Sequence, residues 1–113
     1  MPRVPAVSMT RDVADVPAVE VLGTTAVHLM SAAAVHLGLA EDMPEHRDLD
    51  EARALIDSLA GLVDGAAVHL GHHHAAPLRD GLRSLQLAFK EASAVPDPPG
   101  EGPGEKYTGP VHA

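Results

Sequence analysis

Residues 49–70 read LDEARALIDSLAGLVDGAAVHL, and this stretch decides the fold. Its apolar residues recur at alternating spacings of three and four, which places them on one face of an α-helix as a heptad seam. They are Leu49, Ala52, Ile56, Leu59, Val63, Ala66 and Leu70. Asp48 with Glu51 three residues later resembles a capping box. The pattern therefore predicts a helix that begins at Leu49 and ends between Val63 and Leu70.

A second amphipathic helix is predicted downstream, over residues 75–92. Its apolar residues again repeat at spacings of four and three, and they form one stripe. They are Leu78, Leu82, Leu85, Phe89 and Ala92. Pro77 is tolerated in a first helical turn, where its missing N–H has no partner to lose.

Upstream, residues 17–37 predict a helix of a different kind. It is apolar or small nearly all round, and no charged residue lies between Glu20 and Glu41. Such a helix must be covered on most sides or lie in a membrane. No basic cluster or aromatic belt flanks it, so the membrane is disfavoured. We expect the two other helices to cover part of it and a second copy of the chain to cover the rest, with Ala26 and Ala33 permitting close approach.

Both ends of the chain predict disorder. Residues 1–14 have no periodicity, and Met9 is a second plausible start. Residues 95–113 contain five prolines and four glycines, which prevent a regular element. We therefore predict a disordered segment over 1–14, a helical domain over 15–93 and a disordered tail over 94–113. The predicted fold class is all-α, a small antiparallel three-helix domain with disordered N- and C-terminal tails, completed by dimerisation.

Composition narrows the range of functions. The chain has 113 residues, no cysteine and a formal net charge of -8. The lack of cysteine excludes disulfides, a thiolate zinc site and a cysteine nucleophile. An acidic balance disfavours nucleic-acid binding through a basic surface. A domain of about 80 residues is hard to stabilise alone, which favours a partner chain. No secretory signal is expected at the N-terminus, and the predicted location is the cytoplasm.

The histidines offer a candidate metal site. His69 and His72 are three residues apart, and His69 and His73 are four apart. Either pair on one helix face could bind zinc or another divalent ion through neutral imidazole. Gly71 would interrupt such a helix, and an exposed polar linker is the simpler interpretation. His28 and His36 are each expected to be partly buried and hydrogen-bonded rather than ligands.

A local basic stripe is the remaining charged feature. Arg79, Arg83 and Lys90 fall on one side of the helix predicted over 75–92. They could meet an acidic partner, a second subunit or RNA phosphate, although a solvated face is the simpler interpretation. The sequence contains no nucleophile elbow and no phosphate-binding loop. We predict that the chain is not an enzyme.

Three runs carry a family resemblance: residues 15–39, residues 48–62 and residues 77–91. In order, they give an Ala-rich helix ending His-Leu-Gly, an acidic helix start with Ala-Arg and Ile-Asp, and Leu-x-x-Leu-x-Leu. Together they resemble the bacterial domain of unknown function 1844 in its actinobacterial form. The resemblance implies a short, helical, cytoplasmic protein without an assigned activity, and it favours a ribosome- or RNA-related partner.

Taken with that resemblance, the residues predict a structural or interaction module that forms homo-oligomers. Two alternatives stay open. One is a divalent-metal-binding protein that uses the His69–His74 cluster. The other is an RNA- or ribosome-associated factor that uses the basic stripe. Neither a further cofactor nor a membrane is expected.

Overall fold

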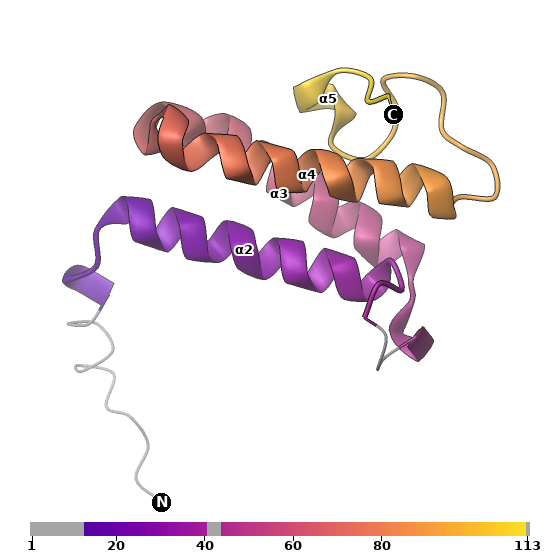
Figure 1. Ribbon diagram of the computed structural model, residues 1–113, viewed down its shortest axis with the longest axis horizontal. Coiled ribbons are helices and arrows are strands. Elements are labelled where there is room, and N and C mark those ends of the chain that lie inside the picture. Colours follow the sequence, from indigo (N-terminus) through magenta and orange to yellow (C-terminus); the bar gives the residue numbers. More distant parts are fainter. Residues whose placement is uncertain (1–12, 41–43, 113) are drawn as a thin grey trace, which may run out of the picture.

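The computed structural model of the protein describes residues 13–40 and 44–112. Its elements are α2 (Ala18–His36), the short 3-10 helix η1 (Pro44–His46), α3 (Leu49–Leu70), α4 (His72–Ala92) and α5 (Glu105–Thr108). The three long helices run back and forth alongside one another, with α2 on one side and α5 on the other (Figure 1). The predicted all-α, antiparallel three-helix fold is confirmed, and the described ranges contain no strand.

The central helix α3 follows its sequence signals closely. Asp48 caps its start, because one carboxylate oxygen accepts hydrogen bonds from the backbone N–H groups of Asp50 at 3.1 Å and Glu51 at 3.2 Å. The helix runs to the later of its two predicted ends, Leu70. Six of the seven seam residues are buried, and Leu49 is partly buried. The heptad seam is therefore the face that α3 turns toward the core.

Helix α2 ends where glycine permits a left-handed residue. Gly38 has φ +81°, and the N–H groups of Gly38 and Leu39 donate to the carbonyls of Val35 and Ala34. This pair of bonds is a Schellman motif, which satisfies carbonyls that the helix itself leaves free. The imidazole Nδ1 of His36 lies 2.8 Å from the carbonyl oxygen of His46. These bonds fix the end of α2 beside the segment that leads into α3.

Helices α3 and α4 are joined by one residue. Gly71, with φ +78°, ends α3 and directly precedes α4, which begins at His72 rather than at the predicted Ala75. The predicted start of this helix was wrong because Pro77 was assigned to the first turn, whereas it lies in the second turn of α4. Its ring removes only the bond to the carbonyl of His73, and that residue is exposed to water.

The core lies between the three long helices. It comprises the buried residues Ala26, Ala33, Leu37, Ala52, Ile56, Leu59, Ala60, Val63, Leu82, Leu85 and Phe89. A smaller cluster at the α3–α4 corner is formed by Ala66, Leu70 and Ala75. Ala26 and Ala33 were expected at a subunit interface, but they are 1% and 0% exposed within this single chain. Their small side chains bring α2 close to its own neighbours in the chain, so that assignment is corrected.

The C-terminal segment, residues 94–112, departs from the predicted disorder. It folds back over α3 and α4, and Pro103, Gly104 and Val111 are buried. Prolines and glycines prevent a long helix there, but they do not prevent a fixed path held by side-chain hydrogen bonds to the backbone. The disorder predicted for residues 1–12 lies outside the described residues.

Two glycines inside α3 give a stability prediction. Gly65 is exposed, and a Cβ there would meet nothing within 4 Å, whereas a Cβ on Gly61 would lie 3.2 Å from the Tyr107 ring. Gly65→Ala should raise the free energy of unfolding by about 0.5–1 kcal/mol, because glycine is the poorer helix former. Urea denaturation measures this, with Gly61→Ala as the control. An equal gain for both variants would contradict the contact at Gly61.

Candidate functional site

The clearest candidate site is the side of α2 that faces away from the core. We define the outer face of α2 as Val21, Thr24, Val27, His28 and Ser31, all of which are exposed. No charged residue lies between Glu20 and Glu41, so this surface is uncharged unless His28 is protonated. Val27 is 53% exposed. An uncharged helix face with two exposed valines, Val21 and Val27, is a candidate for a surface that another molecule covers.

A neighbouring hydroxyl is already satisfied within the helix. Thr25 Oγ1 donates to the carbonyl of Val21 at 2.7 Å. A threonine bonded in this way has its hydroxyl donor satisfied within the helix. Covering this part of α2 therefore leaves fewer polar groups unpaired than the sequence alone indicates.

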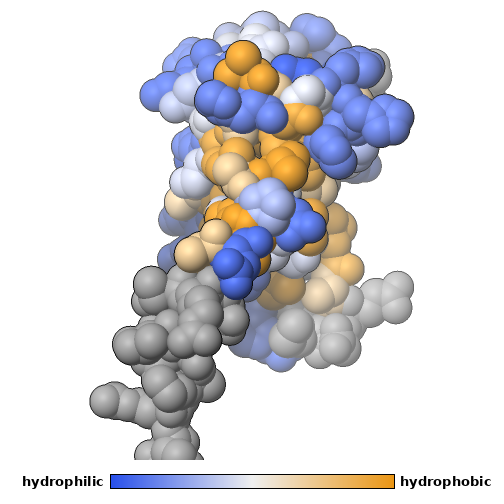
Figure 2. Space-filling model, turned by 90° about the vertical axis from the view of Figure 1, so that its left-hand side faces the viewer, coloured by the Kyte–Doolittle hydropathy of each residue, from blue (hydrophilic) through white to orange (hydrophobic). Residues whose placement is uncertain are grey.

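A shallow groove continues this surface at one end of the molecule. Its apolar lining is Val19, Gly23 and Val27 in the first half of α2 and Leu70 and Leu78 at the α3–α4 corner, and Glu20 and His74 line it as well. Figure 2 looks at that end, and apolar surface runs between the corner above and the start of α2 below. The exposed apolar surface thus extends beyond a single helix face.

Among the described residues, α2 is the one helix long and apolar enough to cross a membrane by length and composition alone. Core helices of soluble proteins meet the same criterion. Here Ala26, Ala33 and Leu37 pack against α3 and α4. Only 11% of its most apolar window is buried within the chain. The core thus accounts for one side of α2 and leaves the other open.

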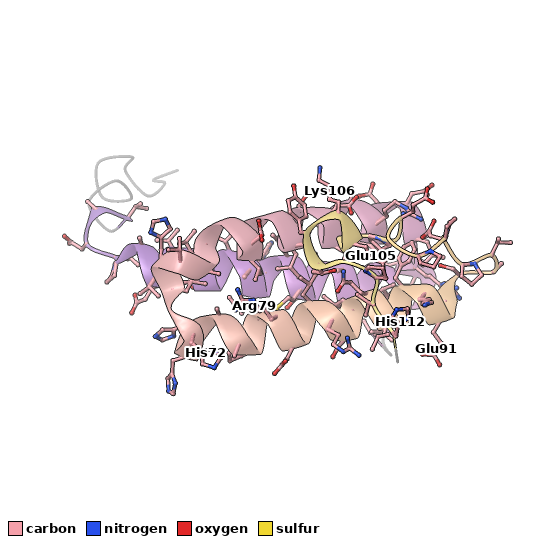
Figure 3. All side chains as sticks on the ribbon, turned by 90° about the horizontal axis from the view of Figure 1, so that it is seen from above. His72, Arg79, Glu91, Glu105, Lys106 and His112 are labelled. Atoms are coloured by element: carbon pink, nitrogen blue, oxygen red, sulfur yellow. The ribbon has the colours of Figure 1, made fainter. Side chains whose placement is uncertain are left out.

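The three histidines predicted to bind metal lie on two different helices. His69 lies in the last turn of α3, and His72 and His73 lie in the first turn of α4 (His72 is labelled in Figure 3). The spacing of three or four assumed one continuous helix, but the chain turns at Gly71 between them. Within residues 13–40 and 44–112, no three His, Cys, Asp or Glu side chains are grouped so that they could hold a metal ion.

The two histidines of α2 differ from each other. His36 is partly buried, and its Nδ1 pairs with the His46 carbonyl, as expected. His28 was expected to be partly buried as well, but it is exposed on the outer face of α2. It therefore belongs to the candidate surface and not to the core.

The predicted basic stripe on α4 is largely engaged within the chain. Lys90 Nζ donates to the carbonyl of Val111 at 3.3 Å, and the Arg83 guanidinium donates to the carbonyl of His112. Arg79 and His112 are labelled in Figure 3. Arg79 lines a pocket with Asp64 and Tyr107. Two of the three cations thus hold the C-terminal segment in place.

Several residues that hold this segment escaped the sequence analysis. They are Arg53, Asp57, Gln86 and Glu105. Gln86 is the buried polar residue of the described chain, at 5% exposed. Its position on the apolar side of α4, between Leu82 and Phe89, was the one available signal. The other three look like ordinary surface charges in the sequence.

Comparison with known proteins identifies the family. Residues 18–91 match the family model described as domain of unknown function DUF1844. No curated protein and no solved structure gives a significant match. The matched region begins at the first residue of α2 and ends one residue before the end of α4, so it excludes α5 and the C-terminal segment. The match covers well over half of the sequence, and the chain therefore belongs to the DUF1844 family.

Proposed function

We propose that this protein is a self-associating helical interaction module in which two copies pair through the outer faces of α2. The observation that carries the proposal is the contrast between the two sides of this helix. One side is closed against α3 and α4, and the other exposes valine, threonine and serine with no charge. A second copy brings an identical surface, as a twofold interface requires.

The distribution of charge favours a second copy of the chain as the partner at the outer face of α2. The chain carries a formal net charge of -8, so two copies repel each other in general. The outer face of α2 is a place where they can meet without opposing carboxylates. Antiparallel pairing fits best, because it separates the two Glu20 side chains and opposes the two helix dipoles. The twofold axis then passes near Val27 and His28, at the middle of the outer face.

Size also favours pairing. A small domain buries a limited share of its apolar surface within one chain. The apolar part of the groove, at Val19, Leu70 and Leu78, would add to the contact beside α2.

We further propose that the protein is cytoplasmic, that it does not bind a membrane and that it comes from a bacterium of the actinobacterial group. The metal and RNA alternatives have less support, because the described histidines are not grouped and two of the three stripe cations are engaged.

The test introduces charge at the proposed twofold axis. Val27→Glu places two carboxylates near each other in the pair and leaves the core untouched, because Val27 is exposed. Its matched control is Val68→Glu, at a valine of α3 that is 83% exposed and outside the outer face of α2. We expect sedimentation velocity to give dimers for wild type and Val68→Glu. Val27→Glu should weaken the dimer by at least about tenfold, or about 1.4 kcal/mol.

Other results would overturn the proposal. Wild-type chain that stays monomeric across micromolar concentrations would do so, as would equal association of the two variants. Flotation of monomeric wild-type chain with phospholipid vesicles would assign the outer face of α2 to a membrane instead. Thermal unfolding followed by circular dichroism verifies that both variants keep the fold.

A further inference from the structure

The C-terminal segment docks on the side of α3 and α4 that faces away from α2 (Figure 1). Viewed from above, α5 lies over α3, and the segment then runs on toward α4 (Figure 3). This surface is separate from the outer face of α2, so its occupancy by the segment is independent of the proposed self-association.

The helices contact the backbone of the segment through side chains. Gln86 Nε2 donates to the carbonyl of Pro103 at 3.0 Å and to Thr108 Oγ1 at 3.1 Å. Asp57 Oδ1 accepts the N–H of Gly104 at 2.7 Å. Side chains that satisfy a partner's main chain in this way are typical of a peptide-binding surface. We call Arg53, Asp57, Gln86 and Lys90 the docking face.

Arg53 anchors the start of the segment. Its Nη2 lies 3.0 and 2.9 Å from the two carboxylate oxygens of Asp97. The guanidinium carbon is 4.9 Å from the centre of the Phe89 ring, which orients the group through a cation–π contact. An arginine that is held on an aromatic ring and paired with a carboxylate both attracts the acidic residue and fixes its position.

The segment is itself preorganised. One oxygen of Glu105 accepts the N–H of Gly102 at 2.8 Å, and the other accepts the N–H of Val111 at 2.6 Å. A single carboxylate therefore ties together the two ends of a turn that contains Pro103 and Gly104. A peptide shaped before it binds loses less conformational freedom on docking.

The C-terminal segment and the helices are in close contact at Gly104. Gly104 is buried with φ +76°, and a Cβ there would lie 2.9 Å from the Cβ of Ala60 and 3.0 Å from Gln86 Nε2. Only glycine fits against the docking face at this position. The face therefore has a shape requirement in addition to its polar contacts.

The connection between segment and domain is exposed. Ala94, Val95 and Pro96 are exposed, and Val95 reaches 85%. The family match ends at residue 91. It includes every position of the docking face and none of the segment. The surface and its occupant are thus distinct parts of the chain.

We infer that the docking face is a binding site for a peptide with a Pro-Gly-Glu turn, and that residues 97–112 are its resident ligand, bound in cis. A short linker holds such a ligand at an effective concentration of about 1 mM. If the segment is docked in about nine chains of ten at this effective concentration, the same peptide supplied in trans has a dissociation constant of about 0.1 mM or tighter.

The test empties the docking face of the full-length chain and supplies the ligand separately. Gly104→Val expels the segment through the clash with Ala60. Gly100→Val is the matched control, because Gly100 also has a positive φ, +87°, and a Cβ there would meet nothing within 4 Å. The probe is a fluorescent synthetic peptide of residues 95–113, followed by anisotropy. We expect Gly104→Val to bind it with a dissociation constant of about 0.1 mM or tighter, and wild type and Gly100→Val at least about tenfold more weakly.

A second peptide and a second chain complete the test. A peptide with Glu105→Ala should bind Gly104→Val at least about tenfold more weakly, because its turn is no longer tied. If Gly104→Val does not fold, the Glu105→Ala chain serves as the emptied acceptor. A folded acceptor whose segment exchanges its amide hydrogens freely, yet which does not bind the wild-type peptide, would overturn the inference. Continued amide protection of residues 102–111 in both chains would overturn it as well.

Discussion

Replacing Ile56 with alanine is expected to lower the free energy of unfolding by about 4 kcal/mol. Ile56 is one of the two largest fully buried side chains, and it lies in the first half of α3 within the main core. Truncation removes three carbon atoms from contact and leaves a cavity that surrounding helices cannot fill completely. Small domains have total stabilities of about 5–15 kcal/mol, so this loss is a large share.

Urea denaturation followed by helical circular dichroism measures the effect. Val68→Ala is the control, because Val68 is 83% exposed on the same helix. Its expected change is within about 0.5 kcal/mol. A loss below about 1 kcal/mol for Ile56→Ala would mean that α3 does not lie at the centre of the core.

Enlarging Ala33 to leucine should cost about 3 kcal/mol. Ala33 is 0% exposed and lies in the main core on the inner side of α2. Leucine and alanine are both good helix formers, so the loss reports packing rather than helix propensity. Added carbon atoms at such a site force α2 away from its neighbours and open contacts along the whole helix.

The matched control is Ala54→Leu, at an exposed alanine of α3. The two roles considered for Ala33, core packing within one chain and contact at a subunit interface, differ in how the loss of stability depends on protein concentration. In the core of one chain, the loss stays the same at every protein concentration, whereas at a subunit interface it varies with concentration. A change no larger than that of Ala54→Leu would contradict the close approach of α2.

Much of the fold could be predicted because its signals are local. The seam of α3, the cap at Asp48 and the terminator at Gly38 each depend on residues within a few positions of one another. Ala26 and Ala33 were correctly read as sites of close approach, but small side chains do not specify which helix approaches. These two alanines pack against helices of their own chain, whereas the sequence analysis had assigned them to an interface with a second copy.

The docking of the C-terminal segment could not be predicted. It rests on bonds between distant residues, such as Asp57 with Gly104 and Gln86 with Pro103, and these leave no periodic pattern in the sequence. The histidine spacing, in contrast, was read on the assumption of one continuous helix. A local pattern was present, but the glycine at position 71 ends α3 and places the histidines on two helices.

The contact between Tyr107 and Gly61 also determines what optical spectroscopy reports for this protein. The chain has one tyrosine and no tryptophan, so nearly all of its near-ultraviolet emission comes from α5. Far-ultraviolet dichroism, in contrast, comes mainly from the three long helices. Emission therefore follows the departure of the C-terminal segment, and dichroism follows the melting of the bundle. The two signals separate wherever the segment leaves before the helices unfold.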